Sequence, residues 1–278
     1  MIKVNSDSIL KWTGERLVTS VEDETATEHL HRYKIAMAYC KNKAVLDIAC
    51  GEGYGSLFLA SLASSVVGVD IDPISVDFAK KKYKKNNLEF KVGSCSAIPI
   101  ESNSIDVVVS FETIEHHNEH EQMMTEIKRV LKPDGLLIIS SPDKTYYSDK
   151  RNFNNAFHVK ELTEDQFKNL LDKNFVNSIL SNQRVVYGSL IVPKTNMGAE
   201  MHLYKGNYSL MSNFQLEPLY NFALASDVDL PIVGPSFFDG HQILKERIDQ
   251  IYNSASFRLG YLLLKPFRMV RSFLGSKK

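Results

Sequence analysis

Helical and extended hydrophobic patterns alternate along the first half of this chain. Apolar residues three and four positions apart predict helices, whereas an uninterrupted apolar run such as residues 105–111 predicts a strand buried on both faces. Helices are expected over 25–40, 56–63, 73–86 and 119–131, and strands over 43–49, 65–71, 88–92, 105–111 and 136–140. This alternation predicts a doubly wound α/β fold with a parallel sheet.

The pattern is looser after residue 142. A helix is expected over 164–171, strands over 177–180 and 185–192, loop over 193–217, a last strand over 218–225, and one or two helices over 241–278, broken at Pro266. We expect one main domain over residues 1–240, with residues 1–42 as an N-terminal helical cap and residues 241–278 as a separate tail.

The composition excludes several classes of protein. Hydrophobic residues make up 44% of the chain and charged residues 24%, as in ordinary globular proteins. Because 33 basic residues balance 33 acidic ones, we expect no nucleic-acid partner. The three cysteines lack zinc-type spacing, and their odd number argues against a disulfide framework. There is no signal-peptide pattern and no long apolar segment, so a cytoplasmic location is expected.

A glycine-rich turn follows the first predicted strand, in the sequence VLDIACGEGYGS over residues 45–56. Ligands of parallel α/β sheets bind beyond the carboxyl ends of the strands, where glycine lets the backbone approach them closely. Asp47 and Glu52 would repel a pyrophosphate but attract a ligand that carries an ammonium and a sulfonium, such as S-adenosylmethionine. Asp70, at the end of the second strand, is placed to accept hydrogen bonds from both ribose hydroxyls of a nucleoside.

Four blocks in this order resemble the class I S-adenosylmethionine-dependent methyltransferases. They are VLDIACGEGYGS, VVGVDID, GSCSAIPIESNSIDVVVSFETIEHH and RVLKPDGLLIIS, and they span roughly residues 43–141, slightly more than a third of the chain. The resemblance implies a Rossmann-like, mostly parallel, seven-stranded sheet. The flanking segments WTGERLVTS, ATEHLHRY and NAFHVKELT are similar to methyltransferases encoded with bacterial surface-polysaccharide (O-antigen or capsule) genes.

The resemblance assigns a set of residues to S-adenosylmethionine. Arg32 would hold the methionine carboxylate, although a solvated arginine on a helix face is the competing interpretation. Family members often have an acid at the position of Ser94, so the adenine contact would pass to backbone groups nearby. The expected cofactor contacts are Arg32, Asp47, Gly51, Gly53, Asp70, Ile71, Ser94, Cys95, Ser96 and Phe111.

The acceptor side is expected after the fourth strand. His116 is the first choice of general base and His158 the second, because histidine titrates in the required range; either could instead only stabilise a helix start. Glu115, His117, Tyr146 and Glu161 are expected to contact the acceptor, with Tyr147 beside them. His116, His117 and His120 could ligate a metal, but no metal is the expectation.

The predicted function is methyl transfer to a sugar hydroxyl in surface-glycan biosynthesis. Another small metabolite, lipid-like or aromatic, is a rival acceptor, and a non-catalytic binding protein on the same fold is a rival of another kind. Residues 256–278 carry six basic residues and no acid among apolar ones. This pattern predicts a basic amphipathic helix that lies on an anionic membrane or, alternatively, docks on its own domain, a second copy or a partner enzyme.

Overall fold

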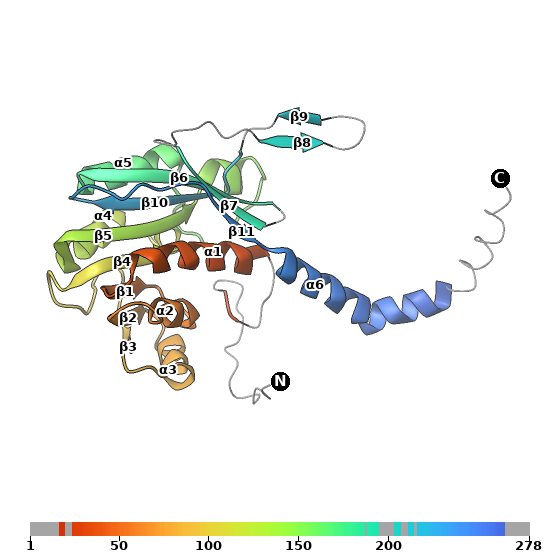
Figure 1. Cartoon of the computed structure of the whole chain (residues 1–278), viewed down its shortest axis with the longest axis horizontal. Helices are drawn as coiled ribbons and strands as arrows, with labels where there is room; N and C mark the ends of the chain where they lie inside the picture. The colour runs from red at the N-terminus through yellow and green to blue at the C-terminus, as the bar shows by residue number, and fades with distance from the viewer. Residues whose placement is uncertain are drawn as a thin grey trace.

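A single mixed β-sheet forms the centre of the protein (Figure 1). The computed structural model describes residues 17–19, 24–186, 188–194, 203–206, 211–213 and 216–264. The strands of the sheet are β1 (Ala44–Ile48), β2 (Ser65–Asp70), β3 (Leu88–Val92), β4 (Ile105–Phe111), β5 (Leu131–Pro142), β6 (Asn177–Val185), β7 (Gly188–Pro193), β10 (Tyr220–Ser226) and β11 (Ser236–Asp239). Their order across the sheet is β11-β7-β6-β10-β5-β4-β1-β2-β3.

Most strands run in one direction. The pairs β1–β2, β1–β4, β2–β3 and β4–β5 are parallel. Strand β10 is antiparallel to both β5 and β6, so β6 runs with β5, and only β7 and β10 oppose the rest. The doubly wound, mostly parallel fold is therefore confirmed. The expected number of seven strands is wrong, because β7 and β11 extend one edge of the sheet to nine.

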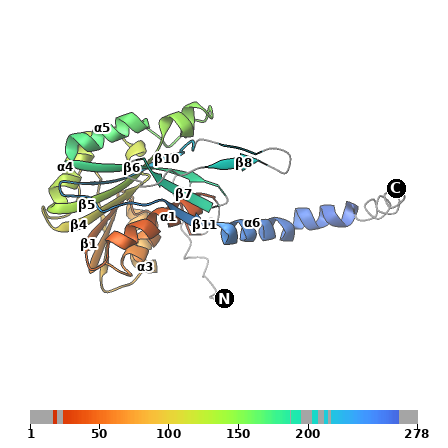
Figure 2. The ribbon, with the colours of Figure 1, turned by 45° about the horizontal axis from the view of Figure 1, so that its top comes forward.

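Helices cover both faces of the sheet. The structure has α1 (Glu24–Tyr39), α2 (Tyr54–Leu59), α3 (Pro73–Lys82), α4 (His120–Val130) and α5 (Glu164–Asn174). Tyr33 and Leu59 belong to an apolar core on one face of the sheet, and Met123 and Phe167 to the core on the other face. Figure 2 shows α5 and α1 on opposite sides. This layering leaves the carboxyl ends of the parallel strands uncovered at one edge.

Several predicted boundaries need correction. The segment KPDG does not precede the strand but lies within β5, where the register against β4 shifts. Residues 193–217 are not entirely loop, since β8 (Tyr204–Gly206) pairs with β9 (Met211–Asn213). Strand β10 is not the last, because β11 follows it. These elements are short, and their hydrophobic pattern is too brief to stand out from loop.

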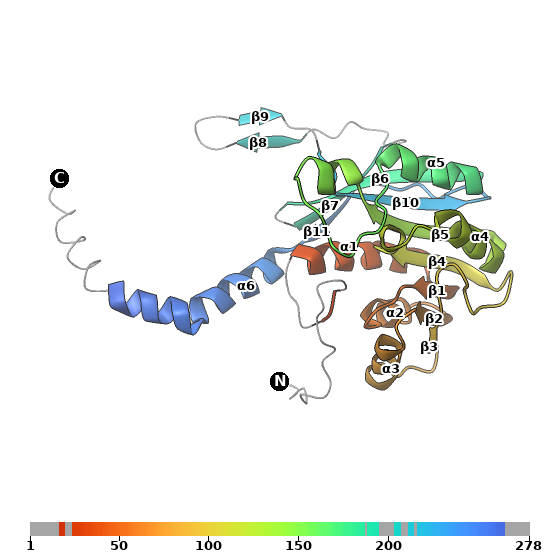
Figure 3. The same ribbon diagram turned by 180° about the vertical axis from the view of Figure 1, so that it is seen from behind.

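The C-terminal helix projects away from the body of the protein in three views (Figures 1, 2 and 3). Helix α6 (His241–Asn253) is interrupted at Ser254, and a further helical stretch covers residues 255–264. The predicted break at Pro266 lies outside the described residues. Within the described part of the chain, no helix has the length and hydropathy needed to cross a lipid bilayer.

Candidate functional site

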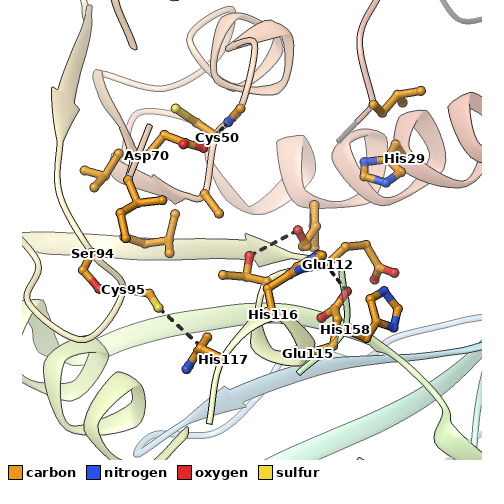
Figure 4. A pocket seen from close by; sticks show the side chains of 18 of the residues that line it. His29, Cys50, Asp70, Ser94, Cys95, Glu112, Glu115, His116, His117 and His158 are labelled. Carbon is orange, nitrogen blue, oxygen red and sulfur yellow. Dashed lines mark hydrogen bonds and ion pairs between the residues drawn. The ribbon is translucent and has the colours of Figure 1, made fainter. Parts of the chain in front are cut away.

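A pocket of about 440 Å³ opens at the carboxyl ends of β1, β2, β3 and β4 (Figure 4). The loops that follow these four strands supply Gly51, Ile71, Ser94 and Glu112 to its lining. Because parallel strands of a doubly wound sheet end along one edge, loops that are far apart in sequence converge here. The pocket therefore lies where the sequence places the ligand.

The turn after β1 brings bare backbone to the pocket. Ala49, Gly51 and Gly53 all have positive φ, at 56°, 53° and 90°. A Cβ at Gly51 would meet no atom within 4 Å, so this glycine leaves the pocket open at the turn. A Cβ at Gly53 would instead lie 2.8 Å from the Phe90 ring. Gly51 thus lines the pocket, whereas Gly53 is required for packing beneath it.

Asp47 supports this turn from below and does not line the pocket. Its carboxyl accepts hydrogen bonds from Ser56 Oγ at 2.6 Å and from Tyr33 Oη at 3.2 Å. Burial raises the pKa of the Asp47 carboxyl from 3.8 to about 7, although the two hydroxyl donors lower it. Asp47 therefore connects β1 to α1 and α2 and fixes the position of the turn.

The two other acids near the turn have different surroundings. Asp70 lines the pocket, and its Oδ2 accepts the Gly51 N–H at 2.8 Å. Glu52 is buried, forms an ion pair with Lys82 and accepts two hydrogen bonds from Thr19, both at 2.7 Å. The expectation that Glu52 attracts a cationic ligand is wrong. Its charge is neutralised by Lys82, and it holds residues 17–19 at the pocket instead.

The loops after β2 and β3 form another wall. Ile71, which follows β2, and Ser94 and Cys95, which follow β3, line the pocket, and the side chain of Ile71 is exposed. Ser96 does not line it, but its hydroxyl lies 2.9 Å from that of Ser94. Cys95 Sγ is 3.3 Å from His117 Nε2, which connects this wall to the loop after β4. Burial raises the pKa of the Cys95 thiol.

Arg32 is fully buried beside the pocket and does not line it. Its Nε donates to Gln183 Oε1 at 2.6 Å, its Nη1 lies 3.2 Å from Glu112 Oε1, and its guanidinium lies over the Tyr220 ring. The interpretation as a solvated surface arginine is wrong. Glu112, which Arg32 holds, has a positive φ of 50°, a strained conformation that is frequent at functional sites.

His116 lies at the end of the short helix η2 (Ile114–His116) and lines the pocket. Its Nδ1 is 3.0 Å from the Phe157 carbonyl oxygen, which can only accept, so Nδ1 carries the hydrogen and Nε2 the lone pair. Glu115 is 1% exposed, with Oε1 at 3.8 Å from that Nε2. Burial, and then Glu112, raise the pKa of Glu115 well above its usual range.

His158 belongs to a hydrogen-bonded group before α5. Its Nδ1 donates to Glu161 Oε1 at 2.5 Å, and its Nε2 accepts from Asn155 Nδ2 at 2.9 Å. The Tyr147 ring stacks on the imidazole. His158 and Tyr147 line the pocket, whereas Glu161 acts behind His158. Tyr146 does not line the pocket, and Lys150 lies over its ring.

The metal set His116, His117 and His120 is not assembled. His117 Nδ1 accepts the Glu119 N–H, its Nε2 contacts Cys95, and His120 Nε2 donates to the His117 carbonyl oxygen. Burial lowers the pKa of both His117 and His120. His117 nevertheless lines the pocket, on the side of Cys95 and away from His116.

Sequence reasoning missed several lining residues. They are Leu17, Thr25, His29, Tyr33, Tyr54 and Tyr220, and all except Tyr54 lie outside the four sequence blocks that carry the resemblance. His29 Nδ1 lies 3.1 Å from Tyr54 Oη, and burial lowers the pKa of His29 to about 3. The polar residues that interrupt the helical pattern of residues 25–40 were the available signal. Phe111, which was expected, lines the pocket and packs on Tyr33.

Comparison with known proteins identifies the central segment. Residues 46–139 match the family described as "Methyltransferase domain". A Mycolicibacterium smegmatis protein named "Probable S-adenosylmethionine-dependent methyltransferase" is 33% identical over 168 residues, covering 59% of this chain and 65% of that protein. A Mycobacterium tuberculosis protein of the same description is 34% identical over 176 residues, covering 62% and 64%. The chain thus spans slightly less than two thirds of these curated relatives.

Solved structures support the fold. An S-adenosylmethionine-dependent methyltransferase of Thermotoga maritima superposes with a TM-score of 0.52 at 15% identity, covering 72% of this chain and 89% of that one. A Pyrococcus horikoshii protein gives a TM-score of 0.51 at 22% identity, covering 73% and 91%. At these identities the likeness shows a common fold. The doubly wound architecture is therefore shared with these solved structures.

The buried Asp47 carboxyl predicts a specific pH dependence of stability. Its pKa is about 7 in the folded protein and near 3.8 when unfolded, so the folded state binds more protons between these values and loses stability as pH rises. From pH 5 to 8 this loss is about 2–3 kcal/mol. Urea unfolding of the Asp47→Asn variant should lack it. Between pH 5 and pH 8, the free energy of unfolding of the variant should therefore rise by about that much relative to that of the unaltered protein.

Asp106→Asn is the matched control on the neighbouring strand. Burial alone would raise the pKa of the Asp106 carboxyl. Hydrogen bonds from Lys132 and the Ala44 N–H outweigh this effect and lower the pKa. Its contribution is lost only in acid, so its effect on the free energy of unfolding should be constant between pH 5 and 8. If the free energies of unfolding of the Asp47→Asn variant and the unaltered protein change in parallel with pH, the raised pKa of Asp47 is contradicted.

Proposed function

We propose that this chain, which carries a class I S-adenosylmethionine-dependent methyltransferase domain over residues 46–139, methylates a hydroxyl group of a sugar. S-Adenosylmethionine is the cofactor of such domains, and the pocket fits it in two respects. Gly51 leaves open space at the turn, and the Asp70 carboxylate lies at the carboxyl end of β2, where it can accept ribose hydroxyls. Ser94 and Cys95 would form the adenine side.

The observation that carries the proposal is the orientation of His116. The Phe157 carbonyl oxygen accepts a hydrogen bond from His116 Nδ1, so the basic lone pair of the imidazole is on Nε2. The His116 side chain lines the pocket. The cofactor supplies a methyl group on a cationic sulfur. His116 would take the proton of the acceptor hydroxyl as that oxygen forms its bond to the methyl carbon, and His158 is the alternative base. The remaining residues position the two reactants.

Polar and aromatic groups surround this histidine, which favours a hydroxyl-rich acceptor. Glu115, His158 and Asn155 line the same part of the pocket and offer hydrogen bonds. Tyr147 and Tyr220 line it as well and present rings on which the face of a sugar can pack. A surface-glycan precursor is the acceptor we propose.

A second acceptor class is favoured by one of the relatives. The protein named "Ubiquinone biosynthesis O-methyltransferase" of Pelagibacter ubique is 34% identical to this chain over 110 residues, covering 39% of the chain and 45% of that protein. Its name indicates O-methylation in ubiquinone biosynthesis, so a hydroxyl on a lipid-like or aromatic metabolite is the second class of acceptor. Incubation of the protein with isotope-labelled cofactor and either nucleotide sugars, lipid-linked sugars or phenolic lipids separates the two classes. Label in the phenolic lipids alone would reject the sugar.

Replacement of His116 by alanine should lower the turnover number about a hundredfold or more, because general-base catalysis typically contributes this much. The affinity for S-adenosylhomocysteine should be retained, since the cofactor side of the pocket is unchanged. His117→Ala is the matched control, because it removes an imidazole on the Cys95 side of the same pocket and should leave turnover at saturating cofactor within a few-fold. Near-normal turnover of the His116→Ala variant would transfer the role of base to His158.

The projecting C-terminal helix supports a further part of the proposal, namely attachment to an anionic membrane. Leu259, Leu262 and Leu263 are each more than 60% exposed, and helix 255–264 exposes apolar side chains around most of its circumference. In the sequence, Arg258, Lys265, Arg268, Arg271, Lys277 and Lys278 follow Asp249, the last acid. Each basic residue near an anionic surface contributes about 1 kcal/mol. Attachment would bring the pocket close to a lipid-linked acceptor.

Flotation with anionic liposomes tests this attachment. The full chain should float at low salt and less at high salt, because the attraction is partly electrostatic. A truncation after Ser254 should stay at the bottom of the gradient and keep its affinity for S-adenosylhomocysteine. If neither form floats while the full chain is dimeric and the truncation monomeric, the helix joins two copies of the chain and the membrane proposal is rejected.

A further inference from the structure

Three side chains on the acceptor side converge on one point. Glu115, His116 and His158 each bring one possible ligand atom within 4.8 Å of the others. Glu115 and His116 come from the segment after β4, and His158 from the loop before α5, so the fold brings together segments about 40 residues apart in the sequence. Figure 4 shows the three side chains side by side at the pocket.

Both imidazoles have the outer partners that metal-binding histidines use. His116 Nδ1 donates to the Phe157 carbonyl oxygen, and His158 Nδ1 donates to the Glu161 carboxylate. Such partners fix the tautomer and the ring orientation, and they leave Nε2 with its lone pair for a metal. A polar helix start alone does not explain why two histidines from different segments are both held with Nδ1 hydrogen-bonded.

Glu115 provides an independent observation. Its side chain is buried, and Oε2 has no hydrogen-bond partner within the described structure. A buried carboxyl oxygen without a partner is unfavourable unless something else satisfies it. Glu112 and Glu161 add negative charge on either side, and the nearby guanidinium of Arg32 is paired with Glu112. A cation at this point would satisfy Oε2 and balance the excess of carboxylates.

We propose that Glu115, His116 and His158 bind Zn²⁺ through one carboxylate oxygen and the two Nε2 atoms, and that the bound ion inhibits methyl transfer. Two imidazoles and a carboxylate are a common zinc donor set, with metal–ligand distances of about 2.0–2.2 Å. Such distances place ligand atoms about 3–3.5 Å apart. The 3.8 Å between Glu115 Oε1 and His116 Nε2 needs only small side-chain rotations to reach this range.

One existing contact must give way. Asn155 Nδ2 donates to His158 Nε2 at 2.9 Å, and its amide also lies 3.4 Å from Tyr147 Oη. Zinc binding requires this amide to turn aside. Removal of the amide should therefore tighten zinc binding, an effect that a purely structural role of Asn155 would not produce.

Inhibition rests on the proposed function, whereas zinc binding does not. In the proposed reaction Nε2 of His116 takes the proton of the acceptor, and a metal ion on the same lone pair removes that capacity. The sequence analysis considered a metal only around His116, His117 and His120 and did not include His158, which lies about 40 residues further along the chain.

The experiment uses the full chain after treatment with a chelator. Zn²⁺ binding is measured by calorimetry, and Co²⁺ serves as a spectroscopic probe of the ligand set. We expect one ion per chain and visible Co²⁺ absorption of four- or five-coordinate type.

Glu115→Gln and Glu161→Gln should each weaken zinc binding about 10–100-fold. Asn155→Ala should tighten it several-fold, and Glu119→Gln, a pocket carboxylate outside the cluster, should leave zinc affinity unchanged. S-Adenosylhomocysteine binding confirms that each variant is folded.

The outcomes separate this proposal from the proposed function. Zinc binding that Glu115→Gln and His158→Ala both leave unchanged, or no binding at micromolar zinc, overturns the site, while methyl transfer by the chelated protein would still support the function. Chelation that abolishes transfer, with zinc restoring it, overturns inhibition and removes His116 from the role of base. Full transfer by chelated protein and its loss on addition of one equivalent of zinc is the result we expect.

Discussion

The left-handed backbone of the turn after β1 is the constraint on which the rest of the site depends. Ala49, Gly51 and Gly53 take this conformation in five residues, and Asp47 anchors the strand beneath them to Ser56 and Tyr33. The Gly51 N–H then meets Asp70 at the end of the next strand. One turn therefore sets the distance between the two strand ends that border the pocket. The burial of a carboxyl with a raised pKa shows that the fold tolerates an unfavourable group to keep this geometry.

The acceptor side is built on a different principle. Its residues come from the loop after β4 and from the segment before α5, and hydrogen bonds between the two hold them in place. The Val159 and Lys160 N–H groups both donate to the Glu115 carbonyl oxygen, and the Phe157 carbonyl oxygen accepts a hydrogen bond from His116 Nδ1. The contacts that would orient His116 as a base would also orient it as a metal ligand. Proton transfer and zinc binding would thus compete for one lone pair, since a single nitrogen cannot serve both.

Sequence patterns predicted the parallel half of the sheet well, because each strand there is a buried apolar run next to a periodic helix. Strands β3 and β4 have the predicted bounds. The patterns failed at β11, which has four residues, and at the hairpin of β8 and β9, whose strands have three each. In the site, Gly51 and Asp70 line the pocket as expected, since motif and topology agree there. Arg32 and Glu52 could not be placed, because their partners Gln183 and Lys82 are brought to them by tertiary packing.

The central claim is that the edge between Gly51 and Asp70 receives the nucleoside of S-adenosylmethionine. Calorimetric titration of S-adenosylhomocysteine into the unaltered protein and its Asp70→Ala variant tests it directly. One site per chain, weakened in the variant by about 1–3 kcal/mol for the polar groups left unpaired, is the predicted result. Asp72→Ala is the matched control, because Asp72 caps α3 by accepting from the Ile74 and Ser75 N–H groups. It should lower stability but not affinity. Equal affinity of the unaltered protein and a folded Asp70→Ala variant would contradict the account.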